Sequence, residues 1–132
     1  MKSQIKKSTE AQIKGRMGEE AALHYLIKNG YKEVTRNYHS KYGEIDLIVK
    51  NAEYIVFAEV KERSIKAVER PSAWVDSRKR KKLIKTAVCY LTENSTELQP
   101  RFDVIEVIYN GNELYVDHME NAFDVDYEYY EY

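Results

Sequence analysis

Three charged residues interrupt two strongly apolar segments of the sequence. Asp46 lies within GEIDLIVK (43–50), and Glu59 and Lys61 lie within EYIVFAEVK (53–61). Both segments have the pattern of strands and are apolar on both faces, which is typical of central strands that are covered on both sides. An uncompensated charge is costly in such a setting. These residues are therefore the first candidates for a chemical role.

The short connection between the two segments predicts how these charges are arranged. Only Asn51-Ala52 separates the strands, so we expect an antiparallel hairpin with a two-residue loop. In that register Asp46, Glu59 and Lys61 share one face. Asp46 lies opposite Phe57 and diagonal to Glu59, about 7–8 Å away. Two carboxylates at this spacing can bind one divalent cation. The alternative is a structural salt bridge in which Lys61 neutralises Glu59.

A fourth charged candidate comes from the first expected helix, residues 13–29. At about 100° per residue, Glu19 falls on the apolar side of this helix, with Leu23 and Leu26. A glutamate on the packed side of a helix that lies over the sheet can approach Asp46. The alternative is a glutamate that extends to solvent at the rim of the interface.

A run of cations predicts a phosphate-binding surface. Six of eight consecutive residues are Lys or Arg near the start of a second helix, which begins between Ser72 and Ser77 and ends near Glu93. If the helix starts near Asp76, the cations lie at the positive end of its dipole, which disfavours each by a few tenths of a kcal/mol, so that helix stability does not explain them. A solvated helix face is the alternative. No base-reading motif is present, so contacts would be to the DNA backbone or shape. The run consists of Arg78, Lys79, Arg80, Lys81, Lys82 and Lys85.

The order of the expected elements indicates the fold class. The sequence predicts five strands, at 31–38, 43–50, 53–61, 101–109 and 113–119. With the two helices the order is αβββαββ, an α/β fold with a mixed β-sheet flanked by helices. We divide the chain into a flexible basic N-terminus (1–12), a folded domain (13–123) and an acidic, tyrosine-rich tail (124–132).

Length and composition exclude several classes of protein. The 132 residues are 43% hydrophobic and 33% charged, and no apolar run approaches the roughly 20 residues of a membrane span. One Cys and three scattered His exclude a Cys/His zinc site. The N-terminus lacks the apolar segment of a signal peptide, so we expect a cytoplasmic protein. Residues 1–112 carry 21 Lys and Arg against 15 Asp and Glu, which favours an anionic partner.

Four strings in this order and spacing resemble the YraN-like family of small bacterial proteins: GRMGEEAALHYL, RNYHSKYGEIDLIV, FAEVKER and RFDVIEV. That family is placed in the PD-(D/E)XK nuclease superfamily, near the archaeal Holliday junction resolvases. The resemblance covers about residues 13–123 and implies a restriction-endonuclease-like core. Ile45 stands where the superfamily's name has Pro, and the segment SIKAVERP lacks the Phe-Gly that usually follows. The implied site consists of Glu19, Asp46, Glu59 and Lys61.

The resemblance implies a metal-dependent endonuclease that acts on structured or branched DNA. Asp46 and Glu59 would hold Mg²⁺ or Mn²⁺, with Glu19 reaching the ion directly or through water. Lys61 would orient the attacking water or stabilise charge on the phosphate. We expect DNA as the partner, no membrane association, and an assembly that could be a homodimer. Two alternatives stay open: a non-catalytic nucleic-acid-binding module with the same fold, and a structural or protein-interaction role.

Overall fold

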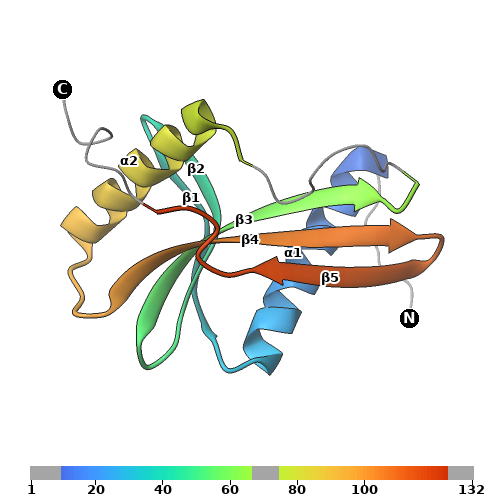
Figure 1. The fold of residues 1–132 in the computed structure, drawn as a ribbon, viewed down its shortest axis with the longest axis horizontal. Helices are drawn as coiled ribbons and strands as arrows, with labels where there is room; N and C mark the ends of the chain where they lie inside the picture. Colours follow the sequence, from blue (N-terminus) through green and yellow to red (C-terminus); the bar gives the residue numbers. More distant parts are fainter. Residues whose placement is uncertain (1–9, 67–74, 125–132) are drawn as a thin grey trace.

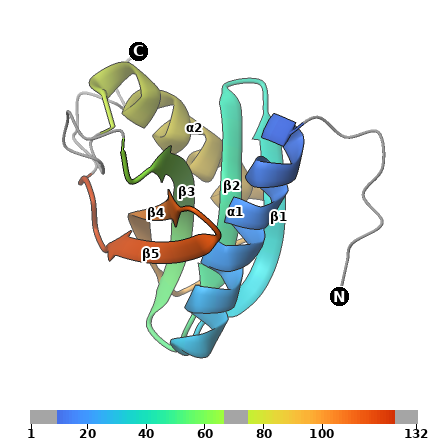
Figure 2. The same cartoon turned by 90° about the vertical axis from the view of Figure 1, so that its right-hand side faces the viewer.

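In the computed structural model a five-stranded sheet lies between two helices, one on each face (Figures 1 and 2). The model describes residues 10–66 and 75–124, so most of the expected N-terminal segment and acidic tail lies outside the described residues. The elements confirm the predicted order and the restriction-endonuclease-like α/β fold: α1 (Glu10–Lys28), β1 (Lys32–Ser40), β2 (Gly43–Lys50), β3 (Tyr54–Ser64), α2 (Ser77–Glu93), β4 (Gln99–Asn110) and β5 (Glu113–Met119).

The sheet is mixed and is covered on both faces. The strands lie in sequence order, and only β3 and β4 are parallel, joined by the crossover that contains α2. Ile48 and Phe57 pack in the core beneath α2, whereas Leu47 and Val56 pack in the core beneath α1. Both cores are built from the apolar faces of β2, β3 and β4, so these strands are central, as the sequence predicts for β2 and β3.

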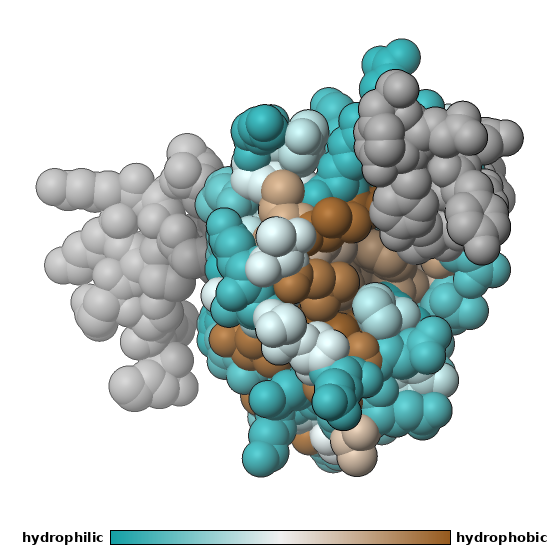
Figure 3. Space-filling model, turned by 90° about the vertical axis from the view of Figure 1, so that its left-hand side faces the viewer, coloured by the Kyte–Doolittle hydropathy of each residue, from teal (hydrophilic) through white to brown (hydrophobic). Residues whose placement is uncertain are grey.

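Aromatic side chains surround one end of the core beneath α2. Tyr90 packs edge-on against Tyr38 and Phe57, with ring centroids 5.2 and 6.0 Å apart. Figure 3 shows the molecule from the side on which α2 ends, with apolar side chains at the centre of the face and hydrophilic ones around them. The apolar surface on this side is therefore bordered by polar residues.

The turn between β2 and β3 differs from the predicted one. Asn51 closes it, because its side-chain oxygen accepts hydrogen bonds from the backbone N–H groups of Glu53 and Tyr54, at 2.9 and 2.7 Å. Asn51 is also paired through its own backbone N–H with the carbonyl of Tyr54. The loop residues are therefore Ala52 and Glu53, one position later than predicted, as Asx-turn chemistry favours.

The later turn changes the register of the hairpin by two residues. Phe57 pairs with Ile48, so the prediction that it lies opposite Asp46 was wrong. A shift of two residues does not by itself change the face of any side chain in the paired part of the hairpin, because the strand repeat is also two. The last registered pair is Leu47 with Ala58. Continued by one step, this register brings Asp46 level with the residue after Ala58.

Beyond that last pair β2 and β3 separate and the sheet forks. β3 stays paired with β4 as far as Ser64, and β2 stays paired with β1 as far as Gly43. Figure 1 shows the two strands diverging, with β3 continuing beside β4. We call the opening between Asp46 on β2 and residues 59–61 on β3 the fork.

Side-chain alternation on β2 also breaks at the fork. Regular alternation predicts that Ile45 shares a face with Leu47 and Val49, but Ile45 is fully buried in the core beneath α2 and the other two lie beneath α1. Asn37 on β1 lies between the partners of Ile45 and Leu47 and has a φ of 51°, in the left-handed region. The irregularity releases Asp46 from either face of the sheet.

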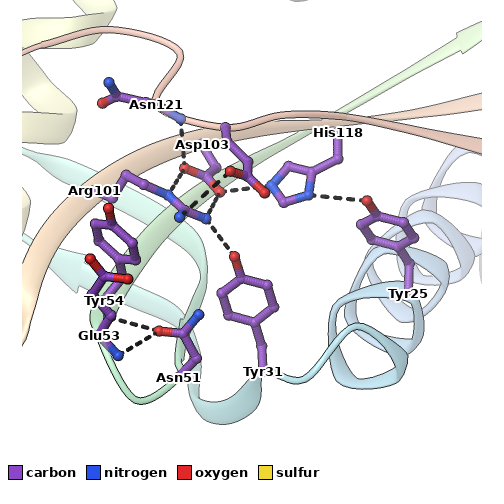
Figure 4. A network of polar contacts seen from close by, with 10 residues as sticks. Tyr25, Tyr31, Asn51, Glu53, Tyr54, Arg101, Asp103, His118 and Asn121 are labelled. Atoms are coloured by element: carbon purple, nitrogen blue, oxygen red, sulfur yellow. Dashed lines mark hydrogen bonds and ion pairs between the residues drawn. The ribbon is translucent and has the colours of Figure 1, made fainter.

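A buried polar network holds the other half of the sheet against α1 (Figure 4). Arg101 donates two hydrogen bonds to Asp103, at 2.9 and 2.7 Å, and one to the Tyr31 hydroxyl at 2.6 Å. His118 lies 2.7 Å from Asp103 and 3.2 Å from the Tyr25 hydroxyl. Burial opposes the Asp103 charge, but the hydrogen bonds from His118 and Arg101 outweigh it and lower the pKa of Asp103.

Asp103→Asn is expected to lower the free energy of unfolding by about 3–5 kcal/mol, because it removes the buried countercharge of Arg101 and leaves this guanidinium only the exposed Glu120, at 3.8 Å. Urea denaturation measures the change. Asp117→Asn, on the exposed side of β5, is the matched control and should change stability by less than about 0.5 kcal/mol. A loss below about 1 kcal/mol for Asp103→Asn would show that the network does not anchor the fold.

Candidate functional site

Asp46 is placed in the fork by a hydrogen bond to the backbone. Its Oδ2 accepts from the Val60 N–H at 2.8 Å, so the carboxylate takes the position of the strand that has moved away. Burial, and then the charges of Glu59 and Glu19, raise the pKa of Asp46 to about 7, against the opposing effect of the Val60 hydrogen bond. Within the described part of the chain, no cation forms an ion pair with Asp46.

Glu59 lies beside Asp46 and is paired with a residue of α2. It is 7% exposed, and its Oε2 contacts the Nζ of Lys79. Burial works against the charge of Lys79, but the hydrogen bond to Glu59 and the charges of Glu59 and Asp46 outweigh it and raise the pKa of Lys79. The fork therefore holds two neighbouring carboxylates, from β2 and β3, and an ammonium group from α2.

Glu19 reaches the fork from α1, on the other side of the sheet. It is half-buried, and its charge acts on Asp46. Gly18 leaves room for the side chain of Glu62 on β3, because a Cβ at this position would lie 2.2 Å from Oε2 of Glu62. No group of three or more His, Cys, Asp or Glu among residues 10–66 and 75–124 is arranged to hold a metal ion. Glu19 thus contributes charge to a site whose nearest carboxylates are Asp46 and Glu59.

Lys61 lies on the same strand and face as Glu59, two residues further along β3. It is half-buried and adjacent in register to Glu106 on β4. Of the four predicted site residues, Glu59 and Glu19 thus both act electrostatically on the third, Asp46, and raise its pKa. Lys61 is linked to them by its position on the strand.

The donor set of the fork fits a hard divalent cation. Asp46 and Glu59 offer carboxylate oxygens, the ligands that Mg²⁺ and Mn²⁺ prefer. Mg²⁺ commonly takes only one or two protein carboxylates and keeps several waters. Burial is the largest cause of the raised pKa of Asp46 and the charge of Glu59 is the second, and a positive charge between the two carboxylates would relieve their repulsion.

The start of α2 places the basic run at the N-terminal end of the helix, where positive charge is least favourable for helix stability. Its first residue is Ser77, and the Asp76 carboxylate caps it by accepting the Lys79 N–H at 2.9 Å. The cations therefore lie at the positive end of the helix dipole, which favours a role other than helix stability.

The structure divides the predicted phosphate-binding run. Lys79 contacts Glu59, and Arg80 donates to the Val75 carbonyl at 2.9 Å. Lys85 lies 5.3 Å from the centroid of the Tyr42 ring. The remaining members have exposed side chains: Arg78, Lys81 and Lys82.

Sequence reasoning missed Glu106 in this region, and it placed Lys79 in the phosphate-binding run without linking it to the fork. Glu106 is 2% exposed beside Lys61, and its Oε2 accepts from Arg63 at 2.8 Å. Its Oε1 has no hydrogen-bond partner among the residues that the structure describes. The signal was present, because Glu106 interrupts the apolar string RFDVIEV as Asp46 interrupts GEIDLIVK. Lys79 gave no such signal for the fork, since only the packing of α2 directs it there.

Neither described helix is long and apolar enough to cross a membrane.

Asp46→Asn is expected to change how stability depends on pH. The pKa of Asp46 is about 7 in the folded protein, against about 3.9 for an unperturbed aspartate, so the folded state holds its proton more tightly. This contribution to stability is present at low pH and is lost as pH rises from about 4 to 7. Between pH 5 and 8 the wild type should lose about 1–2 kcal/mol more than Asp46→Asn, which cannot ionise.

Urea denaturation in EDTA at the two pH values measures this difference. Glu53→Gln removes a charge from the exposed β2–β3 turn and should follow the wild type. Identical pH dependence in Asp46→Asn and the wild type would show that the pKa of Asp46 is not raised in the folded protein.

Comparison with known proteins places the chain in a family. Residues 18–107 match the model of the uncharacterised protein family UPF0102. A UPF0102 protein of Persephonella marina is 39% identical over 87% of this chain and 97% of its own length. One from Caldanaerobacter subterraneus is 44% identical over 83% of this chain and 93% of its own. A UPF0102 protein of Clostridioides difficile is 43% identical over 83% of this chain and 96% of its own length. The chain therefore belongs to the UPF0102 family, which is YraN-like and of the PD-(D/E)XK nuclease-like type.

Proposed function

We propose that the protein is a metal-dependent endonuclease that acts on structured or branched DNA. The observation that carries the proposal is Asp46 in the fork, which forms no ion pair with any described residue and lies beside the buried Glu59. A carboxylate held in the sheet without a cation, and with a second carboxylate next to it, is arranged for an ion that arrives from outside. By contrast with the half-buried Asp46, the three fully buried strand carboxylates in the described part of the chain each have a cationic partner: Glu59 with Lys79, Asp103 with Arg101, and Glu106 with Arg63.

The residues of the fork have separate roles in this proposal. When bound, Mg²⁺ or Mn²⁺ would act as a Lewis acid toward the phosphate and would lower the pKa of a bound water molecule. Asp46 and Glu59 hold the ion, and Glu19 adds negative charge on the far side of the sheet. Lys61 lies on the same face as Glu59, where its ammonium group orients the attacking water or stabilises charge that develops on the phosphate.

The exposed cations of α2 give the proposed site a route to DNA. Arg78, Lys81 and Lys82 lie on the helix that delivers Lys79 to the fork. They suit phosphate contacts, which position DNA without reading its sequence. Structured DNA as the substrate class is supported by the resemblance to the resolvases and by the lack of a base-reading motif.

A nucleic-acid-binding module without turnover is the second candidate. The contact between Lys79 and Glu59 favours it, because an internal cation already neutralises one of the two carboxylates that would bind the metal. Such a module would bind DNA through α2 and show no dependence on Asp46.

Cleavage of a panel of DNA structures tests the proposal. Four-way junctions, flaps and duplexes are incubated with Mg²⁺, Mn²⁺ or EDTA, and products are resolved on denaturing gels. Asp46→Asn should abolish cleavage, and Lys61→Ala should reduce it by about 10²–10³ with little change in DNA affinity, because its role is in the transition state. Lys50→Ala, an exposed lysine at the end of β2, is the control. DNA binding by the wild type without any cleavage would favour the second candidate.

Replacement of Arg78, Lys81 and Lys82 by Gln should weaken DNA binding for all sequences. The slope of log K against log salt should fall by roughly one unit for each lost phosphate contact. Fluorescence anisotropy between 50 and 200 mM salt measures the slope. A triple Gln variant of Lys28, Lys32 and Lys50 removes the same charge from the opposite end of the molecule and should retain the slope. An unchanged slope in the α2 variant would identify its cations as a solvated face.

A further inference from the structure

We propose that Lys79 belongs to the site at the fork: it neutralises Glu59 in the metal-free protein and transfers to a DNA phosphate when metal and DNA bind. The inference rests on the proposed function, since it concerns the same two carboxylates. It assigns to Lys79 a role distinct from that of the other cations in the basic run.

The placement of Lys79 carries the first step. Its Nζ contacts the 7%-exposed Glu59, whereas 49% of its own side chain is open to solvent. Its backbone is fixed, because its N–H donates to the cap residue Asp76 at 2.9 Å. A change of partner therefore requires only rotation of the flexible four-carbon stem, and α2 stays in place.

Charge makes Lys79 and a divalent ion competitors for Glu59. The Nζ of Lys79 contacts Oε2 of Glu59, so its ammonium group already serves as the cationic partner of this carboxylate. A cation bound between Asp46 and Glu59 would lie next to that ammonium group and repel it. Metal binding is thus possible only in the fraction of molecules in which Lys79 has left, and the apparent affinity is reduced by that fraction.

The neighbours of Lys79 indicate where it goes. Arg78 and Lys82 are exposed on the same end of α2. A phosphate bound by these two residues lies within reach of the Lys79 side chain and offers it a second anion. Bound DNA would draw Lys79 away from Glu59 and so free this carboxylate for the metal. A bound metal would in turn displace Lys79 from Glu59 and so free its ammonium group for the DNA phosphate. By linkage each ligand must raise the affinity for the other by the same factor.

The test measures Mn²⁺ affinity directly, from the electron paramagnetic resonance signal of free Mn²⁺ at pH 8 without DNA. Lys79→Gln should bind Mn²⁺ about 5- to 10-fold more tightly than the wild type, as expected if Glu59 is free in about 10–20% of molecules. Lys79→Arg keeps the charge and the pairing and should bind like the wild type. Lys50→Gln removes an equal charge far from the fork and should change affinity by less than about twofold.

A second titration adds a short phosphorothioate duplex that resists cleavage. The duplex should tighten Mn²⁺ binding by the wild type, and by a smaller factor in Lys79→Gln, where the release has already occurred. Equal Mn²⁺ affinities for Lys79→Gln and Lys50→Gln, with binding still lost in Asp46→Asn, would overturn the role of Lys79 and leave the proposed function intact. No Mn²⁺ binding by the wild type and Lys79→Gln alike would overturn the metal site itself, and the role of Lys79 with it.

Discussion

The hydrogen bond from the Val60 amide to the Asp46 carboxylate is the interaction on which the arrangement of the site depends. It forms where β2 leaves β3, and there the amide would otherwise lose its partner within a covered sheet. A side-chain oxygen meets the demand of the backbone, and in doing so a carboxylate is brought beside Glu59. The feature that ends strand pairing is therefore also the feature that gathers charge in the interior.

The two halves of the sheet keep this opening in place for different reasons. β3 continues beside β4, and the buried network of Arg101, Asp103 and His118 holds β4 and β5 against α1. β2 follows β1, where the left-handed Asn37 marks the irregular step. α2 covers the fork from one face and α1 from the other, so each contributes a charged residue: Lys79 from above and Glu19 from below. The proposed metal binding, catalysis and exchange of Lys79 are thus all placed at one junction between the two halves of the sheet.

The element order and the charged strand residues could be predicted from local signals, whereas the geometry at the fork could not. Short apolar segments and the short turns between them identify both hairpins. The register depended on the side chain of Asn51, which closes the turn one residue later than a simple count suggests. The orientation of Ile45 was missed because the irregularity is shared with the neighbouring strand. Lys79 looked like one cation among six, and only the packing of α2 over Glu59 distinguishes it.

The central claim is that the fork binds a divalent ion between Asp46 and Glu59. Anomalous scattering from a crystal grown with Mn²⁺ tests it most directly, because the signal locates the ion without reference to activity. The account predicts a peak within about 2.0–2.3 Å of an oxygen from each carboxylate, with the Lys79 ammonium group displaced from Glu59. A map with no peak in the fork, and with Lys79 still in contact with Glu59 at saturating Mn²⁺, would contradict it.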